Sequence, residues 1–129
     1  MNKRLFQTAC CLTALGIILG AFAAHGLKEK ISPANLDVFE TGVKYHLLHA
    51  LALVVLAFQA HHFESKKFKI VKILFFAGIL FFSGSIYALA TIEINGLISV
   101  KKALGPITPL GGLCLISGWL LLVFSVKKS

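Results

Sequence analysis

Four apolar runs of about twenty residues each dominate this chain of 129 residues, and they constrain its fold more than any other feature. A bilayer core of ~30 Å needs ~20 residues of helix to cross it. Three runs reach that length unaided, and the second, from Tyr45, reaches it if its helix begins one or two turns earlier. We expect one membrane domain over residues 1–129, with spans at 5–24, 43–60, 70–94 and 107–126.

The composition supports the same fold. Apolar residues make up 57% of the chain and charged residues 14%, against roughly 45–50% and 25% in ordinary soluble domains. The runs are apolar on all sides, without the single stripe of a surface helix in a soluble protein. We therefore predict an all-α fold, an integral membrane four-helix bundle whose main partner is the lipid bilayer.

The charged residues predict an orientation. If four helices alternate in direction, one side carries eight basic residues and a single acid, Glu64; the bases are Lys3, Arg4, Lys66, Lys67, Lys69, Lys72, Lys127 and Lys128. The other side carries five basic and four acidic residues: Lys28, Lys30, Lys44, Lys101, Lys102, Glu29, Asp37, Glu40 and Glu93. The positive-inside rule then predicts a multi-pass protein of the cell (inner) membrane with both termini in the cytoplasm. Anionic lipid head groups account for the excess basic charge, so no nucleic-acid partner is expected.

The first run also has some features of a signal peptide. A basic start at Met1–Arg4 precedes it, and Ala21-Phe22-Ala23 resembles a small-x-small cleavage site. The apolar stretch is longer than a usual signal core, however, and it contains the helix-packing pattern of Gly16 and Gly20. We expect the run to stay as an uncleaved span.

The connection between the first two spans has helical character. Ser32-Pro33 is a favourable start for a helix, and Leu36, Phe39 and Val43 would share one face. The pattern fits a short amphipathic helix that lies on the outer leaflet. It fits an early start of the second span, kinked at Gly42, equally well.

The unusual polar residues gather at one end of the predicted spans. They are His25, Tyr45, His46, His49, Ser83, Ser85, Tyr87, Glu93 and Thr108. If the second helix starts near Tyr45, all of them lie in the extracytoplasmic halves of the spans. Polar groups at membrane depth face the bundle interior or a cavity, because lipid does not satisfy them. We predict a polar pocket near the outer leaflet, lined by all four helices.

Several kinds of chemistry fit this pocket. His46 and His49 have the spacing of a metal-ligand pair, and His25 or Glu93 would supply a third ligand. The histidines would also serve as proton carriers or a haem ligand. The alternative is that they bond to neighbouring helices and fix the packing. No cofactor, metal or catalytic arrangement is predicted, since no nucleophile with a base and no nucleotide fingerprint occurs.

Small residues are expected at helix contacts, namely Gly16, Gly20, Gly84, Gly111 and Gly112. Cys10, Cys11 and Cys114 all lie in predicted spans, where they are expected to pack as small apolar residues. Trp119 lies deep in the fourth span and is expected to be a packing residue. His61 and His62 fall in an exposed loop and need no further role.

Six segments, which form four motifs, resemble the YgdD/YwdK family of small four-helix inner-membrane proteins. They are residues 20–27 (GAFAAHGL), 39–46 (FETGVKYH) with 49–52 (HALA), 82–87 (FSGSIY), and 108–112 (TPLGG) with 118–119 (GW). The resemblance covers nearly the whole chain and implies a membrane location and four spans, without a known reaction. It also implies a glutamine in many relatives where His46 stands here, which favours His25 and His49 over an obligatory metal pair.

The expected function is that of a non-enzymatic binding or accessory protein. Its pocket would bind a lipid, a small ligand or a helix of a partner protein, and the face of Gly16 and Gly20 would also suit a homo-oligomer. The alternatives are a small transporter or proton-linked carrier, and a metal- or haem-binding membrane subunit. A carrier needs a polar path through the inner half as well, where the sequence offers only Gln7, Gln59 and Lys72.

Overall fold

The computed structural model describes residues 1–127 and consists of long helices. The elements are α1 (Lys3–Phe22), η1 (Ala23–Leu27), α2 (Pro33–Gln59), η2 (Ala60–His62), α3 (Ser65–Gly78), η3 (Ile79–Ser83), α4 (Gly84–Ala90), α5 (Ile92–Asn95), η4 (Ile98–Val100) and α6 (Lys101–Val123). Four continuous segments, 3–27, 33–62, 65–90 and 98–123, are long and apolar enough to cross a membrane. Residues 1–127 contain no β-strand, only an isolated bridge between Phe63 and Val126. The predicted all-α bundle of four spans is confirmed.

Local signals in the sequence explain where the helices begin and end. The Asn2 side chain accepts a hydrogen bond from the Leu5 amide at 3.1 Å and caps α1. The Ser32 hydroxyl accepts one from the Asn35 amide at 3.2 Å, with Pro33 at the first turn of α2. The chain leaves α5 at Gly96, whose φ of 72° is the left-handed conformation that glycine adopts without a steric penalty.

The second span begins at Pro33, ten residues before the predicted 43–60. Of the two alternatives for this segment, the structure has the early start: the amphipathic turns are continuous with the span. Phe39 and Val43 are buried and Asp37 and Glu40 are exposed, so the predicted two faces are present. The short predicted span reflects these acidic residues, which end the apolar run in the sequence but lie on the exposed face of the helix.

The fourth span also begins earlier than predicted. Its helix α6 starts at Lys101 and contains both Pro106 and Pro109, whereas the predicted span begins at residue 107. A proline inside a helix removes one backbone hydrogen bond, and membrane helices tolerate this because neighbouring groups satisfy the freed carbonyl.

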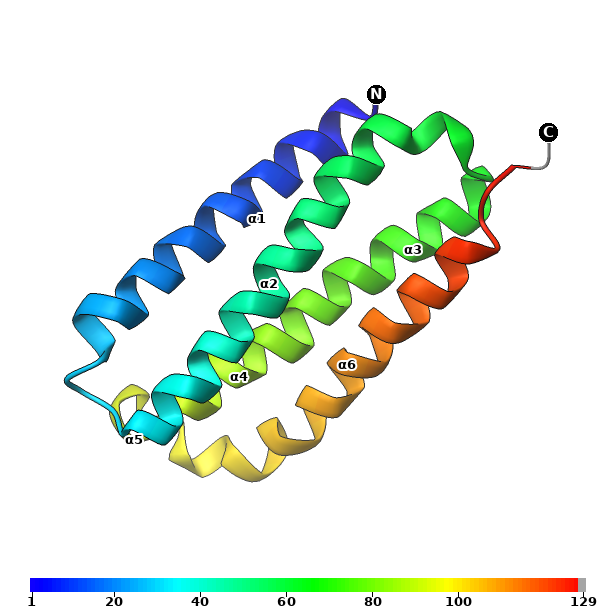
Figure 1. Ribbon diagram of the computed structural model, residues 1–129. Coiled ribbons are helices and arrows are strands. Elements are labelled where there is room, and N and C mark those ends of the chain that lie inside the picture. The colour runs from blue at the N-terminus through cyan, green and yellow to red at the C-terminus, as the bar shows by residue number, and fades with distance from the viewer. Residues whose placement is uncertain (128–129) are drawn as a thin grey trace.

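The helices alternate in direction, so that both described ends of the chain lie at the same end of the bundle (Figure 1). Backbone hydrogen bonds join the segments there: the Asn2 amide donates to the Ala57 carbonyl at 2.8 Å, and the Glu64 amide to the Ser125 carbonyl at 2.8 Å. This end carries the lysine-rich α2–α3 connection. We call it the basic end. The α2–α3 connection and both described ends of the chain, which were predicted to share one side of the membrane, therefore lie at one end of the molecule.

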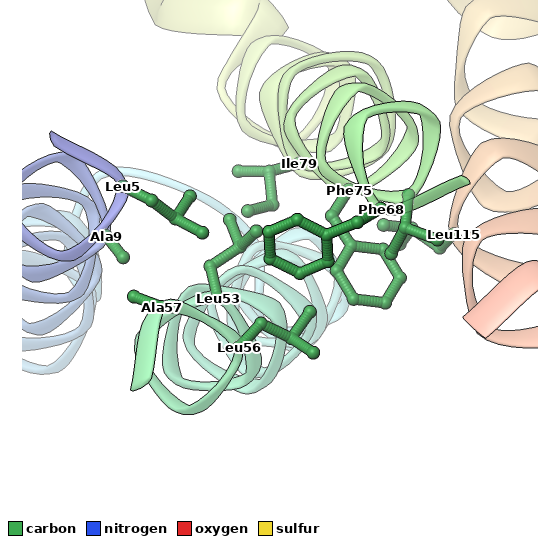
Figure 2. Close-up of a cluster of buried hydrophobic side chains, with 10 residues drawn as sticks. Leu5, Ala9, Leu53, Leu56, Ala57, Phe68, Phe75, Ile79 and Leu115 are labelled. Atoms are coloured by element: carbon green, nitrogen blue, oxygen red, sulfur yellow. The ribbon is translucent and has the colours of Figure 1, made fainter. Parts of the chain in front are cut away.

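The four spans have unequal neighbours. The second and third spans are central, α1 packs against α2, and α6 packs against the third span. Figure 2 shows α1 and α6 on opposite sides of the main core. That core, near the basic end, contains Leu5, Ala9, Leu53, Leu56, Ala57, Phe68, Val71, Phe75, Ile79 and Leu115. A smaller core at the other end contains Ala23, Leu27, Ile31, Phe39, Val43 and Ala90.

Candidate functional site

Two buried histidines occupy the space between the two cores. His46 and His49 are each 2% exposed and lie one turn apart on α2. At 1.5 Å per residue they stand ~20 and ~24 Å from Pro33 on a helix ~40 Å long. They are therefore near the middle of the span, deeper than the outer-leaflet position predicted from a helix that starts near Tyr45.

His46 links three helical segments. Its Nε2 lies 2.9 Å from the Leu12 carbonyl of α1, and its Nδ1 lies 2.9 Å from the Tyr87 hydroxyl of α4. A carbonyl only accepts, so Nε2 bears the proton and donates it to Leu12. In the neutral ring Nδ1 then accepts from the Tyr87 hydroxyl. Both nitrogens of His46 are occupied by protein groups.

His49 has the opposite arrangement. Trp119 Nε1 of α6 donates to His49 Nε2 at 3.0 Å, because an indole nitrogen is only a donor. The proton of the neutral ring is therefore on Nδ1, which donates to the Tyr45 carbonyl of the same helix at 2.7 Å. The Phe75 ring packs edge-on against His49, with centroids 5.4 Å apart. The two histidines are thus opposite tautomers.

The hydroxyl groups form a separate network where α6 and α2 meet the π-helical turn η3. Ser83 donates to the Gly42 carbonyl at 2.7 Å and is fully buried. Ser85 bonds to Thr108 of α6 and to carbonyls of its own helix. These contacts are between helices or within one helix, and no buried side-chain polar atom among residues 1–127 lacks a partner. They fix the packing.

His25 and Glu93 lie apart from these networks. Both are exposed, His25 in η1 and Glu93 in α5, at the end of the molecule opposite the basic end. Neither bonds to His46 or His49, and no three His, Cys, Asp or Glu side chains within residues 1–127 gather closely enough to hold a metal ion. The predicted residues are therefore distributed over separate places and do not line one pocket. The early start of α2 explains this, because it moves the histidines away from the helix ends.

Glycines permit the close helix approaches around the histidines. A Cβ on Gly111 would lie 2.2 Å from the Phe82 backbone nitrogen, and one on Gly16 would lie 2.6 Å from the Leu47 side chain. Gly20 would meet Val43 at 3.3 Å, and Gly112 would make only ordinary contact with the Phe82 ring at 3.5 Å. Three further glycines have contacts as tight, and sequence reasoning missed them: Gly42, Gly78 and Gly118.

Gly84 differs from the other predicted packing glycines. A Cβ there would meet only Leu80 of the same span, at 3.9 Å. No neighbouring helix approaches it closely, although Gly84 lines one side of a groove.

Trp119 is the functional residue that the sequence analysis left out. It was expected to pack, and it does contact Phe75 at a centroid distance of 5.1 Å. Its indole nitrogen also needs an acceptor at a depth without water, and His49 supplies one. A signal was present in the sequence: the single tryptophan is a donor within an apolar span, and a histidine in another span is a complementary acceptor.

A groove runs between α2 and α6 beside the His49–Trp119 pair. We call it the α2–α6 groove. It has a volume of about 310 Å³ and mostly apolar walls, and its lining residues are Tyr45, Leu48, His49, Phe82, Gly112, Leu115, Ile116 and Trp119. The Tyr45 side chain is 44% exposed, and its hydroxyl makes no hydrogen bond to any residue of the described range 1–127. Tyr45 therefore supplies a hydrogen-bond donor among the lining residues of an apolar groove.

The chain is similar to several membrane proteins without a known activity. A family described as a protein of unknown function (DUF423) matches residues 19–112. The UPF0382 membrane protein YwdK of Bacillus subtilis (strain 168) is 44% identical over 115 residues, 88% of each chain. A UPF0382 membrane protein of Staphylococcus haemolyticus (strain JCSC1435) is 39% identical over 116 residues, 90% of this chain and 88% of its own. One of Staphylococcus aureus (strain bovine RF122 / ET3-1) is 41% identical over 109 residues, 84% and 83% respectively.

No solved structure matches the chain. The sequence relatives are membrane proteins, and the four spans agree with that description. The resemblance inferred from the four sequence motifs is confirmed. The chain is a multi-pass membrane protein and belongs to the DUF423 family of proteins of unknown function.

Proposed function

We propose that this protein is a non-enzymatic binding protein of the inner membrane. In the proposal, the α2–α6 groove holds a membrane-dissolved, largely apolar molecule that carries a hydrogen-bond acceptor such as a carbonyl oxygen. The single observation behind it is that Tyr45 lines this groove and only its carbonyl, not its hydroxyl, takes part in a side-chain hydrogen bond within residues 1–127.

The cost of an unpaired donor supports an acceptor as its partner. A hydroxyl moved from water into an apolar medium without a hydrogen bond loses several kcal/mol, and lipid chains offer no acceptor. A guest with a carbonyl group would remove that cost. The volume of about 310 Å³ lies at the lower end of the usual range for small-molecule sites. A single chain or ring system of a lipid-like molecule would fit these apolar walls.

The occupied histidines favour binding over proton transport. Both ring nitrogens of His46 and of His49 already bond to protein groups when the rings are neutral. Protonation of His49 would turn Trp119 Nε1 and His49 Nε2 into two facing donors and break their bond. A proton carrier would have to break such a bond in each cycle, whereas a binding groove gains from walls that stay fixed.

Native mass spectrometry of protein extracted in a gentle detergent tests the proposal. We expect a reproducible extra mass of an apolar molecule with a carbonyl or similar acceptor, and we expect Tyr45→Phe to lower its occupancy severalfold. Tyr87→Phe is the matched control, because it removes a hydroxyl that bonds to His46 outside this groove. Equal occupancy in the wild-type and Tyr45→Phe proteins, or a bare mass in the wild type, would contradict the proposal.

The proposed orientation has its own test. We propose that both termini lie in the cytoplasm, because Lys and Arg are distributed eight to five in favour of that side. In a variant without the native cysteines, Ser99→Cys should react with a membrane-impermeant thiol reagent in intact cells. Ser65→Cys, at the opposite end of the bundle, should react only after the membrane is opened. Both positions are exposed. The reverse labelling pattern would overturn the orientation.

A further inference from the structure

A second groove, independent of the one above, runs along α1 and the third span. It consists of two adjoining hollows of about 400 and 410 Å³ that share the Phe76 side chain in their lining. We call the whole the α1–α3 groove. The hollow at the basic end is lined by Arg4, Lys69 and Lys72 among others. The second hollow is apolar and includes Leu12, Leu15 and Leu80.

The basic residues of this groove have no acidic partners in the described chain. Among residues 1–127 the only ion pair is Lys67–Glu64, at 3.1 Å. Arg4, Lys69 and Lys72 converge on one hollow from two helices, although like charges repel one another there. Lys72 Nζ also lies 5.2 Å from the centroid of the Phe68 ring. An anion between the two helices would relieve the repulsion.

The length of the apolar part matches one lipid leaflet. Along the third span, Lys72 and Gly84 are separated by ~18 Å at 1.5 Å per residue. Half of a ~30 Å hydrocarbon core is ~15 Å. A molecule with its charge at the lysines and its chain along Phe76 and Leu80 would therefore lie parallel to the lipids of the same leaflet. Basic pockets between membrane helices bind anionic head groups in this manner.

We infer that the α1–α3 groove binds one anionic phospholipid from the leaflet at the basic end. Its phosphate lies between Arg4, Lys69 and Lys72, and one acyl chain lies along Phe76, Leu12 and Leu80. The observations behind this are the convergence of three basic side chains without carboxylate partners and the apolar hollow that continues from them.

Lipid competition measured by native mass spectrometry tests the inference. Protein in detergent is mixed with equal amounts of phosphatidylglycerol and phosphatidylcholine that carry the same acyl chains. We expect bound phosphatidylglycerol to exceed phosphatidylcholine severalfold. Combined Arg4→Gln, Lys69→Gln and Lys72→Gln should lower bound phosphatidylglycerol by on the order of tenfold or more, because the variant lacks all three positive charges that attract the phosphate.

A charge-matched control separates this site from general attraction. Lys28→Gln, Lys101→Gln and Lys102→Gln remove the same three charges, all exposed, from the other end of the bundle. This variant should keep the wild-type preference. An equal loss in both triple variants, or equal binding of the two lipids by the wild type, would overturn the inference.

A groove-filling variant tests the acyl-chain part. Leu80 is 65% exposed and lines the groove, so Leu80→Trp should occupy it without any change of charge. We expect this variant to retain severalfold less phosphatidylglycerol. Leu113→Trp, at an equally lipid-facing position on α6 that is 57% exposed, should retain the wild-type amount. Unchanged retention in Leu80→Trp would contradict the chain placement. None of these variants changes Tyr45, so this outcome is separate from that of the α2–α6 groove.

Discussion

His46 and His49 lie one turn apart on α2 with the same burial, yet their surroundings impose opposite tautomers. His46 bears its proton on Nε2 because the Leu12 carbonyl requires a donor. His49 bears its proton on Nδ1 because the Trp119 indole requires an acceptor. The partner, and not the position on the helix, determines which nitrogen is protonated.

The two histidines also differ in what they hold together. His46 bonds to α1 and α4, so it joins two segments across the central helix. His49 makes one hydrogen bond to another span, with Trp119 of α6, and a second within its own helix, with the Tyr45 carbonyl. Loss of His46 should therefore disturb the packing of more elements than loss of His49.

The largest effect is expected at Gly111, which supports the His49 side. Gly111→Ala would place a methyl group 2.2 Å from the Phe82 backbone nitrogen, and a backbone atom does not rotate away. We expect a loss at the upper end of the ~1–3 kcal/mol that overpacking costs, measured by thermal unfolding in detergent. Gly112→Ala is the control, since its methyl group would make ordinary contact at 3.5 Å. If both variants unfold at the same temperature, the close approach of α6 to η3 is wrong.

Replacement of each histidine by leucine should distinguish the contributions of the two sites to stability. His46→Leu leaves the buried Tyr87 hydroxyl without its acceptor, and His49→Leu leaves Trp119 Nε1 without one. Each should cost about 1–2 kcal/mol, with the larger loss at His46 because two interhelical bonds disappear there.

The emission of Trp119 provides the second measurement. The chain has a single tryptophan, so a change in its fluorescence reports on the His49 side alone. His49→Leu should shift the emission, and His46→Leu should leave it close to the wild-type spectrum. A shift of similar size in both variants would mean that the two sites act as one unit.

The number and composition of the spans could be predicted from the sequence, because hydropathy depends on local residue content. The ends of the spans could not. Asp37 and Glu40 interrupt the apolar pattern, yet they lie on the exposed face of the first turns of α2. Because α2 begins at Pro33, His46 and His49 lie in the middle of the span and not at the predicted outer position. They therefore lie apart from His25 and Glu93, with which they were predicted to line one pocket.

The hydrogen-bond partners of the polar residues were harder to predict from the sequence than the spans. His25 and Glu93 were predicted to lie with His46 and His49 because all four are polar and near predicted helix ends. In the structure the first two are exposed and the second two are buried. The bond between His49 and Trp119 joins residues 70 positions apart, and it depends on how α6 packs against the third span. Hydropathy contains no information on such a tertiary contact.

A smaller effect is expected for glutamine at the two positions. The glutamine amide bears a donor and an acceptor at the same end, as His46 does toward Leu12 and Tyr87. His46→Gln should therefore regain more than half of the stability lost in His46→Leu, in the same thermal unfolding measurement. His49→Gln should regain less stability, because the Tyr45 carbonyl lies one turn earlier on the same helix and a longer side chain reaches it poorly. Equal recovery at both positions would contradict the tautomer-specific geometry.

The smallest effect is expected at His62, a histidine outside both sites. His62 is exposed in η2, and its side chain makes no hydrogen bond to any residue of the range 1–127. Its ring contacts only the neighbouring ring of His61, at a centroid distance of 3.8 Å, among the aromatic pairs of this range, and its backbone carbonyl, which accepts from the Lys127 amide at 2.9 Å, is kept in any substitution. His62→Leu should therefore change stability by less than about 0.5 kcal/mol and leave both the tryptophan emission and the bound mass unchanged. A loss as large as that of His49→Leu would show that histidine content, and not the two buried bonding patterns, determines stability.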